Sequence, residues 1–425
     1  MKELILNQDD DFAALIGIDW ADKKHDICEF NSSSGEQNLS VIAHTPESIE
    51  KWALSLLKRY PDKKVAVACE LKRGPLINAL QRFDHIVIYP INPNKVSNYR
   101  KTFSPSGSKS DPVDAALQMK FLQLHRDTLT PLKPVSSLVK QLTQLVEFRR
   151  RIVQERVDVT NRLTDILKQY YPQPLDWFGD KDSLIFCDFL LKWTDLQQLK
   201  RARKQTLLDF LCAHHSRYPD INEGRVLEIR AALPLTTDPS IVLPNRLKVQ
   251  VVVPQLKHLL NAIETLDEQI KILYLQHDDH FIYDSLPGAG ACFAPRLLVA
   301  MGDDRERYQS AEEIQKYAGI APVIEASGKQ SWTHWRYFCP KFLRQTFVEW
   351  AGQTIRYSYW AKAYYAQQMS RGKQHNTAIR SLAFKWIRIL FKLWKDGKAY
   401  DESTYLNALK RQGSPLLKNA AEAPL

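Results

Sequence analysis

The sequence predicts an α/β domain followed by an all-α remainder, and three observations carry this prediction. Residues 13–125 alternate between short apolar runs, typical of strands, and stretches with helical spacing. Residues 134–170 and 247–277 repeat apolar side chains at three-, four- and seven-residue spacings, as long amphipathic helices do. The C-terminal part also has helical spacing. Because 425 residues exceed one hydrophobic core, we expect three domains, at 1–130, 131–280 and 281–425.

The strands of the first domain are predicted from short apolar runs. ALIGID (14–19), KVAVAC (64–69) and HIVIY (85–89) have the composition of buried strands. HDICEF (25–30) follows the first run closely enough to return as its hairpin partner. These runs predict a sheet with both hairpin and crossover connections.

Helices are expected between and after these strands. Helical spacing covers 45–59 and 75–83. Residues 92–110 are rich in Asn, Ser, Pro and basic residues without periodicity, which predicts a mobile, solvated loop. Helix resumes at Asp111.

The middle of the chain is predicted to be a helical region. The apolar pattern of 134–170 and that of 247–277 are each compatible with a long helix paired as a coiled coil. Between them lies an insert, 171–246, whose prolines mark short turns between helices. Its composition does not indicate a role.

Positive charge is concentrated at one end of the chain. The net charge is +11, and residues 326–425 hold 17 Lys or Arg against 5 Asp or Glu. The remaining residues hold 42 Lys or Arg against 43 Asp or Glu. Basicity confined to one region is typical of a surface that binds a polyanion.

The cysteines and the apolar runs are those expected of a cytoplasmic protein. The six cysteines are scattered without a C-x-x-C pair, so we expect free thiols rather than a disulfide framework or a zinc site. No run approaches the roughly 18 to 20 apolar residues of a membrane helix, and residues 1–12 lack an apolar signal core. We expect a cytoplasmic protein that does not enter a membrane.

Four acidic residues form a candidate metal site. Asp19 and Glu70 each come directly after an apolar run, where neighbouring strands can end side by side. Asp111 and Asp114 are three residues apart at the start of a helix and share one face. Four carboxylates on a rigid frame suit Mg²⁺ or Mn²⁺, and two such ions can activate an attacking oxygen and stabilise a leaving one.

The same acids are also compatible with simpler roles in the fold. Asp111 is a good N-cap, and Asp114 a first-turn acid favoured by the helix dipole. A phosphate-binding ATPase of the actin and hexokinase type also begins with a strand followed by Asp, but it needs a glycine-rich turn there. Asp19 is followed by Trp, Ala, Asp, Lys and Lys. The four acids in this order favour the metal site.

The C-terminal part offers motifs that suit nucleic acid. LPGAG (286–290) predicts a helix-hairpin-helix-like turn whose backbone N–H groups can hold a phosphate. Ser327 precedes Gly328 and Lys329 in a predicted loop, where a hydroxyl can be exposed. Beyond it aromatic residues interleave with cations, a composition that can stack on bases and contact phosphates. Nucleic-acid contacts are expected from Lys109, Gly288, Gly290, Lys329, Arg336, Lys341, Arg344 and Arg380.

Part of this aromatic content should instead form a core. Phe342, Phe347 and Trp350 fall at helical spacing. Residues 378–394 form an amphipathic pattern whose apolar face should pack inward, while its cations form a rim. A basic amphipathic helix can also lie on a membrane, but this one lies within a globular sequence.

Several motifs occur in an order that matches a known family. They are GIDWA (17–21), ACE (68–70), KSDPVDA (109–115), LPGAG (286–290), YAGIAP (317–322), ASGK (326–329), KFLRQTF (341–347), LAFKWIRILFK (382–392) and YDE (400–402). Together they resemble the DEDD transposases of the IS110 insertion-sequence family, and the similarity spans nearly the whole chain.

The resemblance implies a RuvC-like, RNase H-like N-terminal domain whose acidic tetrad is Asp19, Glu70, Asp111 and Asp114, binding Mg²⁺. It also implies a C-terminal transposase domain in which Ser327 attacks a DNA phosphodiester and becomes covalently linked to it. Acids and serine are expected from different subunits of a homo-oligomer, a dimer or tetramer. A structured bridge RNA is expected to choose target and donor DNA. A serine hydroxyl is a poor nucleophile unless a metal or a base activates it.

Three hypotheses remain open from the sequence. The first is the RNA-guided transposase with a serine nucleophile. The second is a RuvC-type structure-selective DNA endonuclease, in which water attacks and Ser327 has no chemical role. The third is a nucleic-acid-binding or repressor protein, in which the acids are helix caps and surface charges.

Overall fold

The computed structural model describes residues 12–103, 110–133, 135–214, 218–414 and 416. The chain forms two compact units, Met1–Pro134 and Val135–Leu425, which are described separately. The first is a mixed α/β unit and the second is mainly helical. None of the described helices is both long and apolar enough to cross a bilayer.

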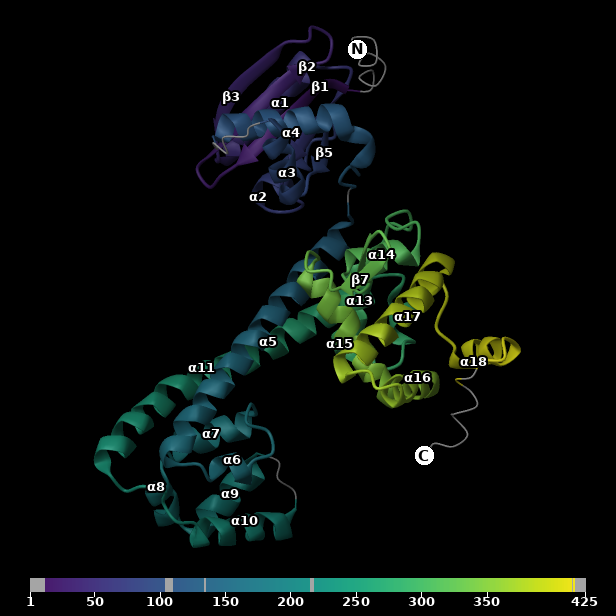
Figure 1. The fold of residues 1–425 in the computed structure, drawn as a ribbon. Coiled ribbons are helices and arrows are strands. Elements are labelled where there is room, and N and C mark those ends of the chain that lie inside the picture. Colours follow the sequence, from purple (N-terminus) through teal and green to yellow (C-terminus); the bar gives the residue numbers. More distant parts are fainter. Residues whose placement is uncertain (1–11, 104–109, 134, 215–217, 415, 417–425) are drawn as a thin grey trace. The chain divides into compact units, whose positions relative to one another are not determined.

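The first unit is built on a five-stranded sheet in the order β3-β2-β1-β4-β5 (Figure 1). β1, β2 and β3 are antiparallel neighbours, whereas β4 and β5 run parallel to β1. The predicted hairpin is confirmed, because Gly17 of β1 pairs with Cys28 of β2. The strands are β1 (Phe12–Trp20), β2 (Lys24–Asn31), β3 (Gln37–Ala43), β4 (Lys64–Cys69) and β5 (Ile86–Pro90).

Helices cover both faces of this sheet. On one face, the predicted helices α1 (Pro46–Arg59) and α2 (Pro75–Leu80) are confirmed, and their apolar residues pack on the side chains of Ile16 and Ile18. On the other face, α4 (Asp111–His125) packs on Leu15, Ala66 and Ala68. The short helix η1 (Arg126–Thr128) follows α4.

One glycine lets α4 lie directly on β1. A Cβ at Gly17 would lie 2.0 Å from the carbonyl oxygen of Ala115 and 2.5 Å from the amide nitrogen of Met119. Only a residue without a side chain permits this approach between two backbones. The contact brings the first turn of α4 to the end of β1.

The prediction of a loop at 92–110 was wrong for most of its length. Residues Pro93–Phe103 form a helix, α3, and residues 104–109 lie outside the described part of the chain. The short helix is held by tertiary contacts rather than by an amphipathic pattern. Val96 is buried, and the Tyr99 ring packs edge-on against Phe121 of α4, with a centroid separation of 5.3 Å.

The second unit contains a pair of long antiparallel helices (Figure 1). α5 (Ser137–Tyr170) and α11 (Pro239–Leu275) confirm the two predicted long helices, although α11 begins at Pro239 rather than 247. Val139 and Leu142, early in α5, share a core with Ile270 and Tyr274, late in α11. The opposite ends pair in a second core. An Asp238 side chain that accepts a hydrogen bond from the Ser240 amide caps the early start of α11.

The insert folds as the helical segment that the sequence predicts. Its helices pack on the distal ends of α5 and α11 around Phe186, Phe189, Trp193 and Phe210. They are α6 (Pro174–Trp177), α7 (Leu184–Lys192), α8 (Leu196–Arg201), α9 (Lys204–Ala213) and α10 (Pro219–Ala231).

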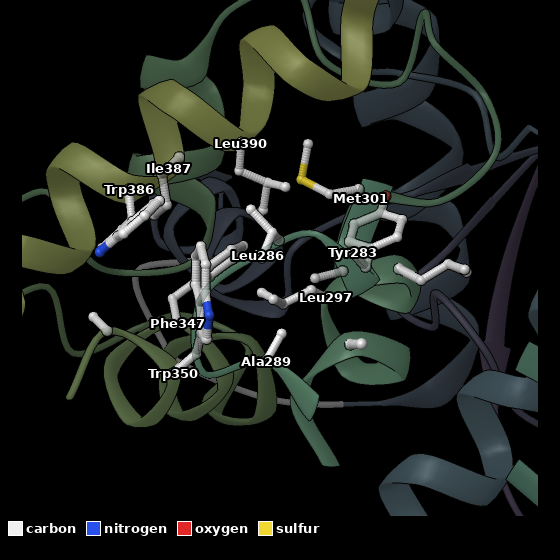
Figure 2. Close-up of a cluster of buried hydrophobic side chains, with 14 of the residues drawn as sticks. Tyr283, Leu286, Ala289, Leu297, Met301, Phe347, Trp350, Trp386, Ile387 and Leu390 are labelled. Carbon is white, nitrogen blue, oxygen red and sulfur yellow. The ribbon is translucent and has the colours of Figure 1, made fainter. Parts of the chain in front are cut away.

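The C-terminal core lies at the other end of the helix pair. Its helices are α12 (His280–Asp284), α13 (Gly290–Met301), α14 (Ala311–Tyr317), α15 (Lys341–Tyr357), α16 (Tyr359–Ser370), α17 (His375–Asp396) and α18 (Glu402–Arg411). Figure 2 shows Phe347 and Trp350 of α15 facing Trp386 and Leu390 of α17. The predicted core roles of Phe347 and Trp350 are therefore confirmed.

Four fully buried tryptophans each find a partner for the indole N–H. Buried Trp favours such a partner because an unpaired donor is costly. Trp350 donates to the carbonyl of Pro287, and Trp394 donates to the carbonyl of Gly302. Trp360 donates to Tyr400 and Trp386 to Thr354. These bonds join segments that are distant in the chain.

Replacing Gly17 with alanine should weaken the first unit, because the new methyl group overlaps the α4 backbone. We expect a loss of about 1–3 kcal/mol, typical of overpacking. Hydrogen exchange should show faster exchange of the amides of β1 and α4 in this variant.

Gly179→Ala is the matched control, because a Cβ there meets nothing within 4 Å. Unchanged protection of β1 and α4 in Gly17→Ala would contradict the direct contact between them.

Candidate active site

Asp19 and Glu70 lie at the ends of two neighbouring parallel strands. Ile18 of β1 pairs with Cys69 of β4, and the two acids directly follow this pair. Both are partly buried. Burial first, and then the negative charges of Glu70 and Asp19, raise the pKa of the Cys69 thiol to about 11. Both carboxylates therefore lie near the same thiol.

Strand alternation assigns Asp19 to the face that α4 covers. Side chains of a strand alternate between faces. Leu15 packs against α4 and Gly17 touches its backbone, so Asp19 belongs to the same face. In β4, Ala66 and Ala68 also pack toward α4, and Glu70 directly follows the last residue of that strand.

Asp114 reaches this edge of the sheet from α4. Its residue is 3% exposed, and it precedes Ala115, whose carbonyl touches Gly17. Asp111 is exposed at the first helical position, and Ser110 rather than Asp111 is the N-cap. The structure thus places Asp19 and Asp114 on one face of the sheet, with Glu70 at the end of the strand beside Asp19. Asp111 lies one turn away at the surface.

An arginine that the sequence did not single out binds Asp114. Arg100 of α3 forms an ion pair with the Asp114 carboxylate, and both side chains are largely buried. Among the described residues, no three or more His, Cys, Asp or Glu side chains lie close enough together to hold a metal ion. The described acids therefore do not form a ready metal cluster, and Asp114 is engaged by a guanidinium. Nothing in the aperiodic stretch 92–110 marks Arg100 as such a partner.

A pair of histidines lies beside Trp20, the residue after Asp19. The His25 ring is buried, and its Nε2 lies 2.8 Å from Nδ1 of His44. The amide of Ala21 donates to Nδ1 of His25, so we infer that the ring proton is on Nε2. Burial first, and then the charge of His44, lower the pKa of His25 from 6.5 to about 4.

Ser327 lies in a two-stranded hairpin of the second unit. β6 (Val323–Ser327) and β7 (Gln330–His334) are antiparallel, and Ser327 pairs with Gln330. Gly328 and Lys329 form the two-residue turn, with Gly328 at a φ of 59°, a left-handed conformation that favours glycine. The serine is exposed. The predicted loop is therefore the tip of a hairpin, within a part of the chain expected to be wholly helical.

Glu325 ties the two strands of this hairpin together. Its carboxylate accepts a hydrogen bond from the indole of Trp332, at 2.9 Å, and lies 2.7 Å from Nε2 of His334. These bonds cross the hairpin two residues before Ser327. The hairpin is thereby held in register although its side chains are exposed.

The LPGAG turn packs against α15. Gly288 and Gly290 both have positive φ angles, of 67° and 49°. A Cβ at Gly288 would lie 3.0 Å from the Tyr357 ring, and Trp350 donates to the carbonyl of Pro287. The turn connects α12 and α13, as a helix-hairpin-helix-like turn should.

The predicted nucleic-acid-binding cations differ in what they contact. Lys329 and Lys341 are exposed, whereas Lys109 lies outside the described residues. Arg336 donates to the carbonyl of Ala321. The other two guanidinium groups, from Arg344 and Arg380, lie over the ring of Trp335.

Arg344 also binds the backbone, donating to the carbonyls of Arg336 and Tyr337. Burial and the charge of Arg344 lower the pKa of Arg380. These two arginines therefore have structural contacts of their own, and their contact with nucleic acid stays a prediction.

Comparison with known proteins gives similarities to transposases in both units. An IS110-type DEDD transposase family model matches residues 16–172, and an IS116/IS110/IS902 transposase family model matches residues 282–366. The chain is 27% identical over 421 residues to the mini-circle putative transposase for IS117 of Streptomyces coelicolor, covering 97% of this chain and 100% of that protein.

Two further relatives are products of insertion elements. The uncharacterized 43.6 kDa protein of insertion element IS110 from Streptomyces coelicolor is 26% identical over 303 residues, which is 70% of this chain and 73% of that protein. The uncharacterized 44.8 kDa protein of IS116 from Streptomyces clavuligerus is 24% identical over 394 residues, covering 91% and 95%.

The lowered pKa of His25 predicts that acid destabilises the first unit. The unfolded chain takes up a proton near pH 6.5, whereas folded His25 stays neutral until about pH 4. Stability contributed by neutral His25 is therefore present above pH 6.5 and is lost as the pH falls from 6.5 toward 4. Melting temperature should fall more steeply over this window in the wild type than in His25→Gln.

An NMR titration of the wild-type His25 ring checks the same claim without a substitution. Protonation of that ring near pH 6.5 would contradict it.

Proposed function

Because the chain belongs to the IS110 family of DEDD transposases, we propose that it excises and inserts its insertion sequence with Mg²⁺ at the acidic site and Ser327 as nucleophile. One observation carries the proposal. Asp19 and Glu70 end adjacent parallel strands on the face where α4 delivers Asp114. Carboxylates that are distant in sequence have no reason to meet at one edge if they serve only as caps and surface charges.

We propose that the first unit is a RuvC-like, RNase H-like domain. Its sheet order, with an antiparallel β2 and parallel β1, β4 and β5, supports this assignment. The antiparallel pair of α5 and α11 likewise supports the coiled coil. The C-terminal core with the serine hairpin would be the transposase domain.

The donor chemistry at this edge fits Mg²⁺ or Mn²⁺. The candidate ligands are all carboxylates, which these hard cations prefer. Asp19, Glu70 and Asp114 would hold the metal, and Asp111 would complete the set from the first turn of α4. Bound metal would supply positive charge to a phosphate and to the attacking oxygen. The chain itself contributes the rigid edge that keeps the acids in place.

Ser327 is our candidate for the attacking group. Its position next to a tight turn exposes the hydroxyl, and Lys329 in that turn supplies positive charge for a phosphate. Attack would join the serine oxygen to phosphorus and release a DNA hydroxyl. The new phosphodiester keeps the energy of the old one, so the strands can be rejoined without ATP. We propose that the serine and the acids come from different subunits of a homo-oligomer.

The excess of basic residues in 326–425 supports binding of DNA and of a bridge RNA. The exposed Lys329 and Lys341 are the best candidates for phosphate contacts, and the amides of the LPGAG turn are further candidates. The guanidinium of Arg336 can add to this surface.

Ser327→Ala should abolish an SDS-stable covalent adduct between the protein and DNA carrying the element ends. Asp19→Asn should reduce its formation at least about a thousandfold, because loss of a group that acts as part of a catalytic unit removes most of the rate. The measurement is a gel shift of labelled DNA after denaturation, with and without Mg²⁺.

Ser331→Ala is the matched control, since Ser331 is an exposed serine of the same hairpin. If Ser327→Ala still cuts branched DNA without an adduct, the endonuclease that uses water is correct instead.

A bridge RNA predicts that a defined RNA copurifies with the chain. Sequencing of this RNA should return a transcript that matches DNA flanking the gene. The transcript should be more abundant with the wild-type protein than with the Lys329→Glu, Lys341→Glu double variant purified in the same way. Recovery of bulk cellular RNA alone would contradict the proposal that a bridge RNA guides this protein.

A further inference from the structure

The ion pair between Arg100 and Asp114 has the features of an exchangeable contact at the acidic site. Arg100 is 19% and Asp114 5% exposed at the side chain, so the pair is shielded from water. The Nε of Arg100 is buried and has no hydrogen-bond partner. The guanidinium therefore uses only part of its donor capacity, and a buried donor left unpaired is costly.

α3 does not depend on Arg100 for its attachment to α4. Val96 is fully buried, and the ring of Tyr99 packs edge-on against both Phe121 and His125. These apolar contacts anchor the helix independently of the ion pair. The Arg100 side chain can leave Asp114 while α3 stays in place.

A guanidinium and a divalent cation compete for the same carboxylate. Without a cation, Asp114 would be an uncompensated buried charge, which is strongly unfavourable. Arg100 supplies the missing positive charge in the metal-free chain. Metal bound to Asp114 would lie close to that guanidinium and would repel it.

We propose that Arg100 is a resident counter-ion that occupies Asp114 in the metal-free chain and must be displaced for the metal to bind there. The inference rests on the proposed acidic metal site and adds its regulation. Arg100 then sets the metal affinity. It neutralises Asp114 when no metal is present, and it raises the Mg²⁺ concentration that is needed to fill the site.

Isothermal titration of the full chain with MgCl₂ tests the inference. Arg100→Gln should bind Mg²⁺ about tenfold more tightly than wild type, because the competing guanidinium is gone. This factor lies within the usual range of coupling between two groups that bind one protein. Arg100→Lys keeps the charge and should bind like wild type. Mg²⁺ should also raise the melting temperature of Arg100→Gln more than that of wild type, because tighter binding to the folded state stabilises it more.

Arg59→Gln is the matched control, because Arg59 pairs with the buried Glu29 in the same unit and away from the acids. It should leave Mg²⁺ affinity unchanged. In an Asp114→Asn background, Arg100→Gln should have no effect either, since the competition is then absent.

Two failures are distinguishable. If Asp19→Asn abolishes Mg²⁺ binding but Arg100→Gln binds equally or more weakly than wild type, the metal site stands and Arg100 is instead a residue that positions Asp114. If Asp19→Asn leaves Mg²⁺ binding unchanged, the proposed metal site itself is wrong, and the role of Arg100 is wrong with it.

Discussion

The contact between Gly17 and the α4 backbone is the constraint on which the candidate site depends. Because glycine has no side chain, Ala115 and Met119 approach β1 at a distance that any Cβ would prevent. This sets the height of α4 above the sheet and brings Asp114 toward the end of β1. Asp114 then lies on the sheet face to which strand alternation also assigns Asp19.

Electrostatics impose the second constraint on this edge. Carboxylates brought together in a partly buried place repel one another unless a cation lies among them. Arg100 provides such a charge to Asp114 from α3, and it does so through a pairing that leaves its Nε without a partner. This pairing neutralises Asp114 in the metal-free chain, and the proposed metal would have to replace it. The Ser327 hairpin of the second unit has the opposite character, since it is exposed and held by backbone pairing and by the side chain of Glu325.

The elements that the sequence pattern did not predict were missed for one physical reason. β3 has no apolar run because nearly all its side chains are exposed, and backbone pairing with β2 holds it. α3 lacks an amphipathic pattern because a few contacts to α4, such as those of Tyr99, secure it. The β6–β7 hairpin is likewise exposed and held by cross-strand bonds. Periodicity reports burial, so elements stabilised by pairing or by single contacts escape it.

The sequence by itself determined the buried strands β1, β4 and β5 and the two long helices, because each carries a local pattern of burial. It also marked the four acids, two at strand ends and two in the first turn of a helix. Only the tertiary structure decided which acids share an edge and which cation holds Asp114. Register between parallel strands and the approach of a helix to a sheet depend on residues far apart in the chain. No local pattern encodes the pairing of Arg100 with Asp114, since it arises from the packing of α3 on α4.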